Sequence, residues 1–258
     1  MINYNDIKKK FENLGFIKIN RFIDDDNFFE LCKELNDQIN KKFFLEKKRI
    51  KNLGGNLIGN ININLGHKGD KIWSYLKKKN INKLISDLTD FKDNEYSVFC
   101  GGNLLFAHPN SHNQLFHTDG KKKPRKIIIS LCLDNIDKDN GPTELYEKSH
   151  IEELPYWKFL FKYFFKKKYQ LSLNKGDIFV REAFIWHRGT KNNSLKNRTL
   201  INFIISEEKN KDLNYESNKE IYFFDNMFES NFFGKIKEFA NVRLKVLYFI
   251  YKFFRSFV

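Results

Sequence analysis

The chain has 258 residues, of which 41% are hydrophobic and 28 are phenylalanine, so it can fill the core of one large domain rather than stay disordered. Its apolar runs are shorter than the about 20 residues of a membrane-spanning helix, and the polar, lysine-rich residues 1–12 are unlike a secretory signal. The net charge of +14 suits an acidic partner such as nucleic acid, an anionic lipid surface or a phosphorylated substrate, but a coding sequence rich in A and T produces the same lysine excess.

The N-terminal third predicts helices with one short strand. Residues 5–45 contain two stretches with apolar side chains at helical spacing, and Gly15 between them ends the first helix. Residues 16–19 read as a strand, residues 46–70 as a glycine- and asparagine-rich loop, and residues 73–88 as a further helix. Three cysteines, Cys32, Cys100 and Cys132, have unrelated spacings and apolar neighbours, which indicates buried free thiols and a cytoplasmic location.

From residue 96 onward the pattern changes to short β-type runs separated by turn residues. The runs are 96–107, 126–133, 143–147, 169–173, 177–186 and 199–206. Such a series predicts a mainly β fold of the sandwich or jelly-roll type with flanking helices. Residues 156–168 interrupt it, because lysines four positions apart among aromatic residues indicate an amphipathic helix.

The first candidate for chemistry is the segment 114–120, which reads QLFHTDG. His117 and Asp119 are two positions apart, so in an extended chain both project from the same face. A His-x-Asp pair arises readily by chance, and a metal site needs a third ligand.

His187, at the end of the apolar run 177–186, is the predicted third ligand. Two histidines and one carboxylate form the facial triad of non-haem Fe(II) oxygenases, although the same set can bind catalytic zinc. Arg198 follows eleven positions later, and Asn192 and Asn193 midway favour a turn. A hairpin there would place Arg198 opposite His187. An arginine in that place suits a co-substrate carboxylate, for which a zinc hydrolase has no use.

These motifs resemble the phytanoyl-CoA dioxygenase family of Fe(II)- and 2-oxoglutarate-dependent oxygenases. His117, Asp119, His187 and Arg198 match the family's His-x-Asp, distal His and trailing Arg. The segment 140–150 resembles the family's Asn-Gly turn and Pro-Gly-Ser-His, with glutamate and lysine in place of Pro-Gly, and the similarity extends over about residues 8–206.

The resemblance implies a double-stranded β-helix (jelly-roll) core with Fe(II) held by His117, Asp119 and His187. It implies 2-oxoglutarate as co-substrate, held by Arg198. Because Asp119 is present, where related halogenases have a small residue, the resemblance favours a hydroxylase. We also interpret Gln114 and Thr143, together with Asn103, as contacts for 2-oxoglutarate or the substrate.

The expected domain organisation is an oxygenase domain over 1–240, made of a helical region over 1–95 and a jelly-roll core over 96–206. A C-terminal amphipathic helix over 241–258 follows it.

Several neighbouring residues have simpler interpretations. Ser149 and His150 fit a turn better than a pocket wall, and Trp186 fits a packing role. Arg188 either meets an anionic substrate or faces solvent. The substrate class stays open among small molecules and lipid-linked or carbohydrate-linked compounds, and so does the oligomeric state; we expect no nucleic acid partner.

The alternative function is a non-catalytic jelly roll or a peripheral membrane-binding module. Residues 242–258, wound as a helix, collect Lys245, Tyr248, Lys252, Arg255 and Ser256 into one polar stripe beside an apolar arc. Such a helix packs on its own domain, pairs with another subunit or lies in a membrane interface. We hypothesise weak attachment to the inner face of a membrane, since 156–168 repeats the lysine and aromatic pattern.

Overall fold

Two antiparallel sheets form the centre of the computed structural model, which describes residues 4–52, 60–92, 95–107, 113–208, 220–224, 236, 240 and 244–256. The larger sheet has the strand order β1-β7-β4-β9-β3-β2-β10, and the smaller has the order β6-β5-β8. In chain order the strands are β1 (Phe16–Ile19), β2 (Asn60–Asn64), β3 (Ser97–Leu105), β4 (Lys126–Cys132), β5 (Thr143–Leu145), β6 (Tyr169–Gln170), β7 (Ile178–Glu182), β8 (His187–Gly189), β9 (Arg198–Ser206) and β10 (Tyr222–Phe223).

Side chains of the larger sheet alternate between two environments, as the pleat of a strand requires. On β4, Ile127 and Ile129 belong to the main hydrophobic core, whereas Ile128 and Ser130 line a cavity between the sheets. The strand β9 follows the same alternation, with Phe203 in the main core. One face of the sheet therefore builds the core and the other face builds the site.

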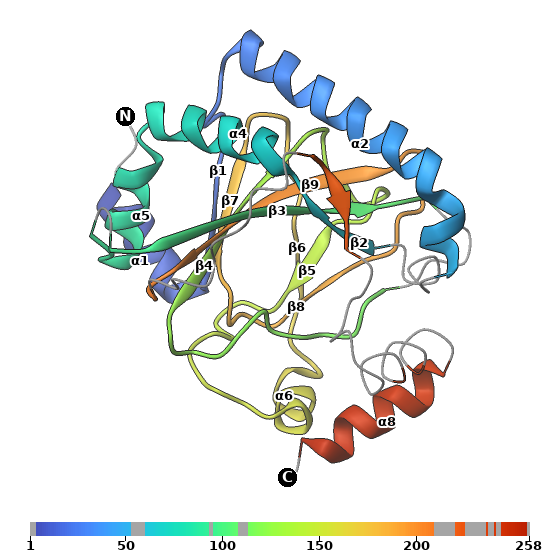
Figure 1. Ribbon diagram of the computed structural model, residues 1–258. Coiled ribbons are helices and arrows are strands. Elements are labelled where there is room, and N and C mark those ends of the chain that lie inside the picture. The colour runs from blue at the N-terminus through green and yellow to red at the C-terminus, as the bar shows by residue number, and fades with distance from the viewer. Residues whose placement is uncertain are drawn as a thin grey trace.

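Helices cover the core-forming face of the larger sheet (Figure 1). They are α1 (Tyr4–Leu14), α2 (Asp26–Asn52), α4 (Gly66–Lys78) and α5 (Ile81–Thr89). Gly15 adopts a φ of 84° directly after α1, where its N–H donates to the Phe11 carbonyl, so the predicted end of this helix is confirmed. The prediction of a loop over 46–70 is partly wrong. The helix α2 continues to Asn52, β2 covers Asn60–Asn64, and α4 begins at Gly66. The expected helix over 73–88 is two helices, separated at Asn80, which has a φ of 59°.

The run 177–186 is not one strand, contrary to the sequence-based expectation. Its first half is β7 in the larger sheet, a turn follows at Ala183 and Phe184, and β8 begins at His187 in the smaller sheet. The chain therefore crosses from one sheet to the other within four residues. Leu145, Leu171, Phe179 and Ile185 fill the space between the two sheets.

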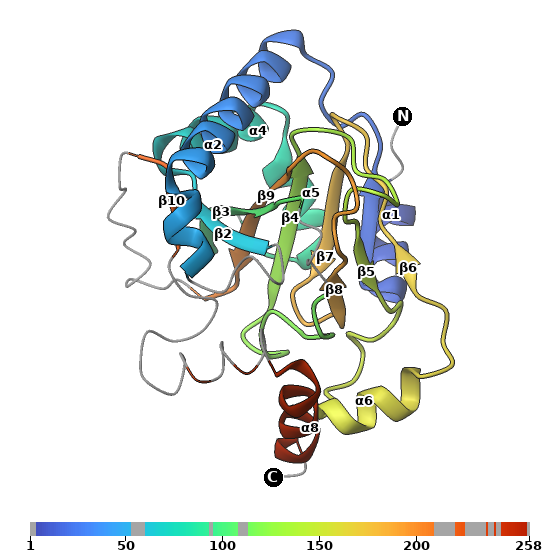
Figure 2. The ribbon, with the colours of Figure 1, turned by 90° about the vertical axis from the view of Figure 1, so that its right-hand side faces the viewer.

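The two facing sheets make the double-stranded β-helix fold that the sequence predicts, with helices outside it (Figures 1 and 2). The N-terminal region is not purely helical, because β1 and β2 belong to the larger sheet. The predicted helix over 156–168 is the shorter α6 (Tyr156–Tyr163), and the C-terminal helix is α8 (Lys245–Arg255). Both figures show α6 and α8 side by side at the end of the molecule opposite α2. None of the helices in the described portion of the chain is long and apolar enough to cross a membrane.

Candidate metal centre

The three predicted metal ligands meet where an extended segment, residues 113–119, lies beside β8. His117 and His187 exchange backbone hydrogen bonds of 2.9 and 3.0 Å as antiparallel bridge partners. The N–H of Asp119 donates to the Ala183 carbonyl at 2.8 Å, which continues the pairing. As expected for residues two apart in an extended chain, His117 and Asp119 reach the same side.

The side chains converge closely enough to hold one ion. Nε2 of His117 lies 3.6 Å from Oδ1 of Asp119, and Nε2 of His187 lies 3.3 Å from Oδ2. One ligand atom from each of the three residues lies within 4.8 Å of the others. Nδ1 of His117 is 2.9 Å from the Leu115 carbonyl and Nδ1 of His187 is 3.0 Å from the Ile185 carbonyl. Because a carbonyl only accepts, Nδ1 of each ring carries the proton and Nε2 keeps its lone pair for a metal.

The electrostatic surroundings keep these ligands in the forms that bind a cation. Burial and the neighbouring His187 lower the pKa of His117 to about 4, so that ring is neutral at physiological pH. Burial alone would raise the pKa of the Asp119 carboxyl, but His187 and Arg181 outweigh it and lower this pKa well below the usual value of 3.8. Asp119 is therefore a carboxylate.

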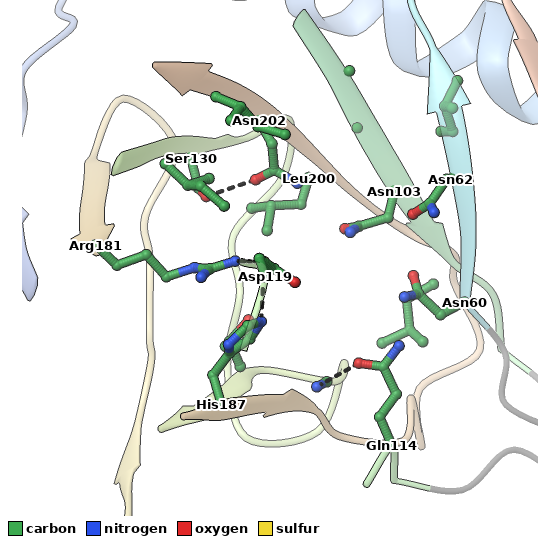
Figure 3. Close-up of a pocket in the computed structure, with 18 of the residues that line it drawn as sticks. Asn60, Asn62, Asn103, Gln114, Asp119, Ser130, Arg181, His187, Leu200 and Asn202 are labelled. Atoms are coloured by element: carbon green, nitrogen blue, oxygen red, sulfur yellow. Dashed lines mark hydrogen bonds and ion pairs between the residues drawn. The ribbon is translucent and has the colours of Figure 1, made fainter. Parts of the chain in front are cut away.

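Arg181 is a site residue that sequence reasoning missed. It lies on β7, its side chain is 9% exposed, and its Nη2 pairs with Oδ2 of Asp119 (Figure 3). Its other terminal nitrogen, Nη1, is buried and has no hydrogen-bond partner among the residues that the structure describes. The signal was present, because a charged residue directly after the apolar run Ile178 to Val180 needs a partner in the interior.

Arg198 lines the same cavity from β9, which like β7 belongs to the larger sheet. Nη2 donates to the Gly141 carbonyl at 2.7 Å, and Nη1 lies 3.4 Å from Oδ1 of Asn103. The buried Nε has no partner in the described part of the chain. Burial lowers the pKa of Arg198 to about 10, so the guanidinium stays charged at neutral pH. The predicted hairpin between His187 and Arg198 is wrong, since β8 pairs with β5 whereas β9 pairs with β3 and β4. The two residues reach one cavity because their sheets face each other.

The cavity has a volume of about 520 Å³ and two chemically different walls. Asp119, Arg181 and His187 form one wall in Figure 3, and carboxamide side chains lie opposite them. These carboxamides belong to Asn60, Asn62, Asn103 and Gln114, and Ser130 donates a 2.6 Å hydrogen bond to Asn202 nearby. The cavity thus offers the candidate metal ligands on one side, and neutral hydrogen-bonding groups together with the charged Arg198 on the other.

Of the remaining residues considered in the sequence analysis, some line the cavity and others have a structural role. Gln114 and Thr143 line the cavity, and Oε1 of Gln114 accepts from the Gly189 N–H at 2.8 Å. Ser149 accepts from the N–H of Trp186 at 2.9 Å and donates to the Tyr146 carbonyl, which is the structural role expected for it.

Three further side chains lie outside the cavity lining. His150 contacts the Glu12 carbonyl through Nε2. Trp186 stacks on Phe159 with ring centroids 4.0 Å apart, as expected for a packing residue. Arg188 pairs with Glu144 at 2.7 Å and is half-buried, so it is not simply solvent-facing, and a contact with an anionic substrate stays a prediction.

A jelly-roll cavity in which two imidazoles and one carboxylate converge on a single point is the arrangement typical of non-haem iron oxygenases. Residues 11–200 match the family model described as phytanoyl-CoA dioxygenase (PhyH), and the chain belongs to this family. Among curated proteins, no sequence matches this chain.

Solved structures share the fold at low sequence identity. The epimerase SnoN, in complex with Fe3+, alpha ketoglutarate and nogalamycin RO, is 11% identical with a TM-score of 0.59, over 79% of this chain and 83% of SnoN. The alpha ketoglutarate dependent carbocyclase SnoK from nogalamycin biosynthesis is 12% identical with a TM-score of 0.58, over 78% and 83%. AviO1 from Streptomyces viridochromogenes Tue57 is 16% identical with a TM-score of 0.57, over 80% and 96%. At these identities the likeness supports the fold alone.

Proposed function

We propose that this protein is an Fe(II)- and 2-oxoglutarate-dependent dioxygenase. The observation that carries the proposal is the convergence of His117, Asp119 and His187 within 4.8 Å at the wall of a cavity that Arg198 also lines. Family membership and the Fe3+ and alpha ketoglutarate in the SnoN complex support the same conclusion.

The three residues fit Fe(II) as they stand. Both Nε2 atoms are free to bind because the Nδ1 atoms donate to backbone carbonyls, and Asp119 supplies one anionic oxygen. A 2-His-1-carboxylate set leaves open coordination positions, which a keto acid and O₂ require. The zinc alternative uses the same ligands but leaves Arg198 without a role.

Arg198 fits the distal carboxylate of 2-oxoglutarate. Among the described residues no carboxylate pairs with it, although it is only 4% exposed and its Nε lacks any partner. A buried cation without a counter-ion is costly, and a bound dicarboxylate would neutralise it through charge-assisted hydrogen bonds. When bound, iron and 2-oxoglutarate supply the oxidising chemistry. The chain's own contribution is to hold the two reactants, place the substrate and limit the access of water.

The cavity lining supports a polar, hydroxyl-bearing substrate. Carboxamides such as those of Asn62 and Gln114 both donate and accept hydrogen bonds without carrying charge, which suits the hydroxyl groups of a sugar or polyol. The carboxylate of Asp119 occupies a coordination position that a halogenase would leave for chloride, as the family resemblance implies. We therefore propose hydroxylation of a C–H bond in a small-molecule, carbohydrate-linked or lipid-linked substrate.

The test is anaerobic reconstitution of the full chain with Fe(II) and 2-oxoglutarate. We expect a 2-oxoglutarate-dependent absorption band and, after O₂ is admitted, succinate. The His117→Ala variant should lose both signals, whereas His67→Ala, in a half-exposed position on α4, should keep them. A wild-type protein that gives neither band nor succinate would contradict the proposal and favour a non-catalytic module.

A further inference from the structure

The C-terminal helix α8 packs against the domain with polar side chains as well as apolar ones. The Phe249 ring lies 6.1 Å from the Tyr156 ring. Nζ of Lys252 donates to the Phe116 carbonyl at 2.9 Å and lies 4.4 Å from the centre of the Tyr156 ring. Oγ of Ser256 accepts from the Trp157 N–H at 3.1 Å. An amphipathic helix on a protein surface normally buries most of its apolar side, whereas α8 uses part of its contact with the domain for Lys252 and Ser256.

Much of the apolar side of α8 is consequently exposed. Phe254 is 64% exposed and Val246 is 72% exposed, and Leu247, Ile250 and Tyr251 are exposed as well. The exposed area continues onto α6 and the residues after it, where Phe161, Phe164 and Phe165 are 71, 73 and 93% exposed. The rings of Phe161 and Phe253 are 6.5 Å apart, which joins the two helices. We call these eight exposed residues the α6–α8 surface: Phe161, Phe164, Phe165, Val246, Leu247, Ile250, Tyr251 and Phe254.

Basic residues border this surface. Lys166, Lys167 and Lys168 are exposed and directly follow Phe165, and Lys158 is exposed on α6. Lys162 of α6 is neutralised by Glu152, but the other four carry no ion pair among the described residues. The whole chain has a net charge of +14. An occupant of the surface must therefore accept aromatic and aliphatic side chains and supply negative charge.

We propose that the α6–α8 surface docks on an anionic lipid bilayer. Its aromatic and aliphatic side chains enter the boundary between headgroups and acyl chains, and the lysines contact anionic headgroups. A second copy of the chain suits the surface less well, because a two-fold contact would bring two clusters of the same lysines together. The phenyl rings of Phe164 and Phe165 are the main expected anchors, since they are the most exposed aromatic side chains on α6 and the turn after it.

The contacts that hold α8 on the domain also connect the α6–α8 surface with the candidate metal centre. The carbonyl that Lys252 binds belongs to Phe116, the residue before His117. A bilayer beneath α6 and α8 would therefore lie on the side of the molecule where the 113–119 segment runs. The proposal is independent of the proposed chemistry, because lipid binding needs neither iron nor co-substrate.

Co-sedimentation of the full chain with vesicles tests the proposal. One set of vesicles contains phosphatidylcholine alone and the other contains phosphatidylserine as about a third of the lipid. The triple variant Phe164→Ser, Phe165→Ser, Phe254→Ser removes exposed side chains from the surface. The matched control is Phe44→Ser, Leu45→Ser, Leu195→Ser, at exposed positions elsewhere that are 75, 74 and 99% accessible. We expect the wild type and the control to sediment with anionic vesicles, and the first variant to bind at least about 10-fold more weakly.

A second pair of variants tests the role of charge. Lys166→Gln, Lys167→Gln, Lys168→Gln should weaken binding to anionic vesicles and flatten its salt dependence, whereas Lys77→Gln, Lys78→Gln, Lys79→Gln at the end of α4 should not. Because all these side chains are exposed, circular dichroism should show unchanged folding. Equal sedimentation of the two serine triples, or no wild-type binding to anionic vesicles at low salt, would overturn the proposal. So would a dimer in solution that the first serine triple dissociates.

Discussion

The carbonyl oxygen of Gly141 accepts a 2.7 Å hydrogen bond from Nη2 of Arg198. Gly141 has a φ of 84°, and a Cβ atom there would lie 2.1 Å from Cδ2 of Leu105. The turn before β5 thus needs glycine both for its backbone angle and for space. The turn therefore helps to orient the guanidinium of Arg198, the proposed carboxylate-binding residue, although Arg198 itself lies on β9.

A Gly141→Ala substitution should weaken 2-oxoglutarate binding because the displaced turn carries the carbonyl that orients Arg198. We expect a rise of about 10-fold in the KM for 2-oxoglutarate, together with a loss of stability of about 1–3 kcal/mol. The control is Gly15→Ala, which has the same φ of 84° and a clash with His150. The Gly15→Ala variant should lose stability without a change in the KM for 2-oxoglutarate. If Gly141→Ala and Gly15→Ala had the same KM, the turn at Gly141 would have no role in co-substrate binding.

Replacing Arg198 itself should affect the co-substrate more than the metal. For Arg198→Ala we expect a loss of about 2 kcal/mol or more in 2-oxoglutarate binding, or roughly 30-fold in Kd, since a charge-assisted pair is lost. Arg198→Lys should restore some of this loss. Arg188→Ala, which removes a guanidinium already paired with Glu144, serves as the control. Titration of the anaerobic Fe(II) complex with 2-oxoglutarate measures the effect, and an unchanged Kd for Arg198→Ala would exclude this role.

Arg181 should act on the metal through Asp119. The variant Arg181→Met keeps the buried aliphatic length but removes the group that holds Oδ2 of Asp119. Loss of such an outer partner should weaken Fe(II) binding by about 10-fold or more, measured by competition with a chelator. Arg125→Met, which breaks the 2.7 Å ion pair with Glu182 instead, should leave Fe(II) affinity unchanged. Tighter binding in Arg181→Met would show that repulsion between the guanidinium and the cation dominates.

Asp177 should contribute stability that depends on pH. Its side chain is 1% exposed and accepts from the N–H groups of Asn174 and Arg21 and from Lys18. Burial alone would raise the pKa of Asp177, but these partners outweigh it and lower the pKa below 3.8. A lowered carboxyl pKa gives stability that is complete above the unfolded-state pKa and is lost as the pH falls through the folded-state value.

The test for Asp177 is chemical denaturation of Asp177→Asn across this range. At neutral pH the variant should be less stable by about 1–3 kcal/mol, because charge-assisted hydrogen bonds are lost. The difference should shrink as the pH falls below 3.8. A difference that does not change with pH would mean that the loss comes from packing alone.

The sequence predicted which candidate ligands come together better than it predicted how the chain connects them. His117 and Asp119 could be paired because two residues apart in an extended segment share a face, and the segment is extended. The crossing at Ala183 and Phe184 could not be predicted, because a mostly apolar segment such as 177–186 has the same pattern whether it stays in one sheet or passes to the next. The hairpin prediction failed for this reason.

The helix α8 illustrates a second limit of sequence patterns. Helical periodicity correctly grouped Tyr248, Lys252 and Ser256 on one stripe, but it cannot tell which stripe meets the protein. Only the tertiary contacts reveal that Lys252 and Ser256 of this stripe meet the domain. The same is true of Arg181, whose partner lies 62 residues away in sequence.

His187 and Arg198 lie in opposing sheets, so the distance between the candidate metal centre and the proposed carboxylate-binding residue depends on the spacing between the two sheets. Their separation is set by the side chains that fill the space between the sheets, among them Leu145 and Leu200, and not by the connection over 190–197. Insertions in that connection should therefore leave the preferred length of the dicarboxylate unchanged. Trimming Leu145 or enlarging Cys132, neither of which is a proposed ligand, should instead shift the preference toward a shorter or a longer keto acid.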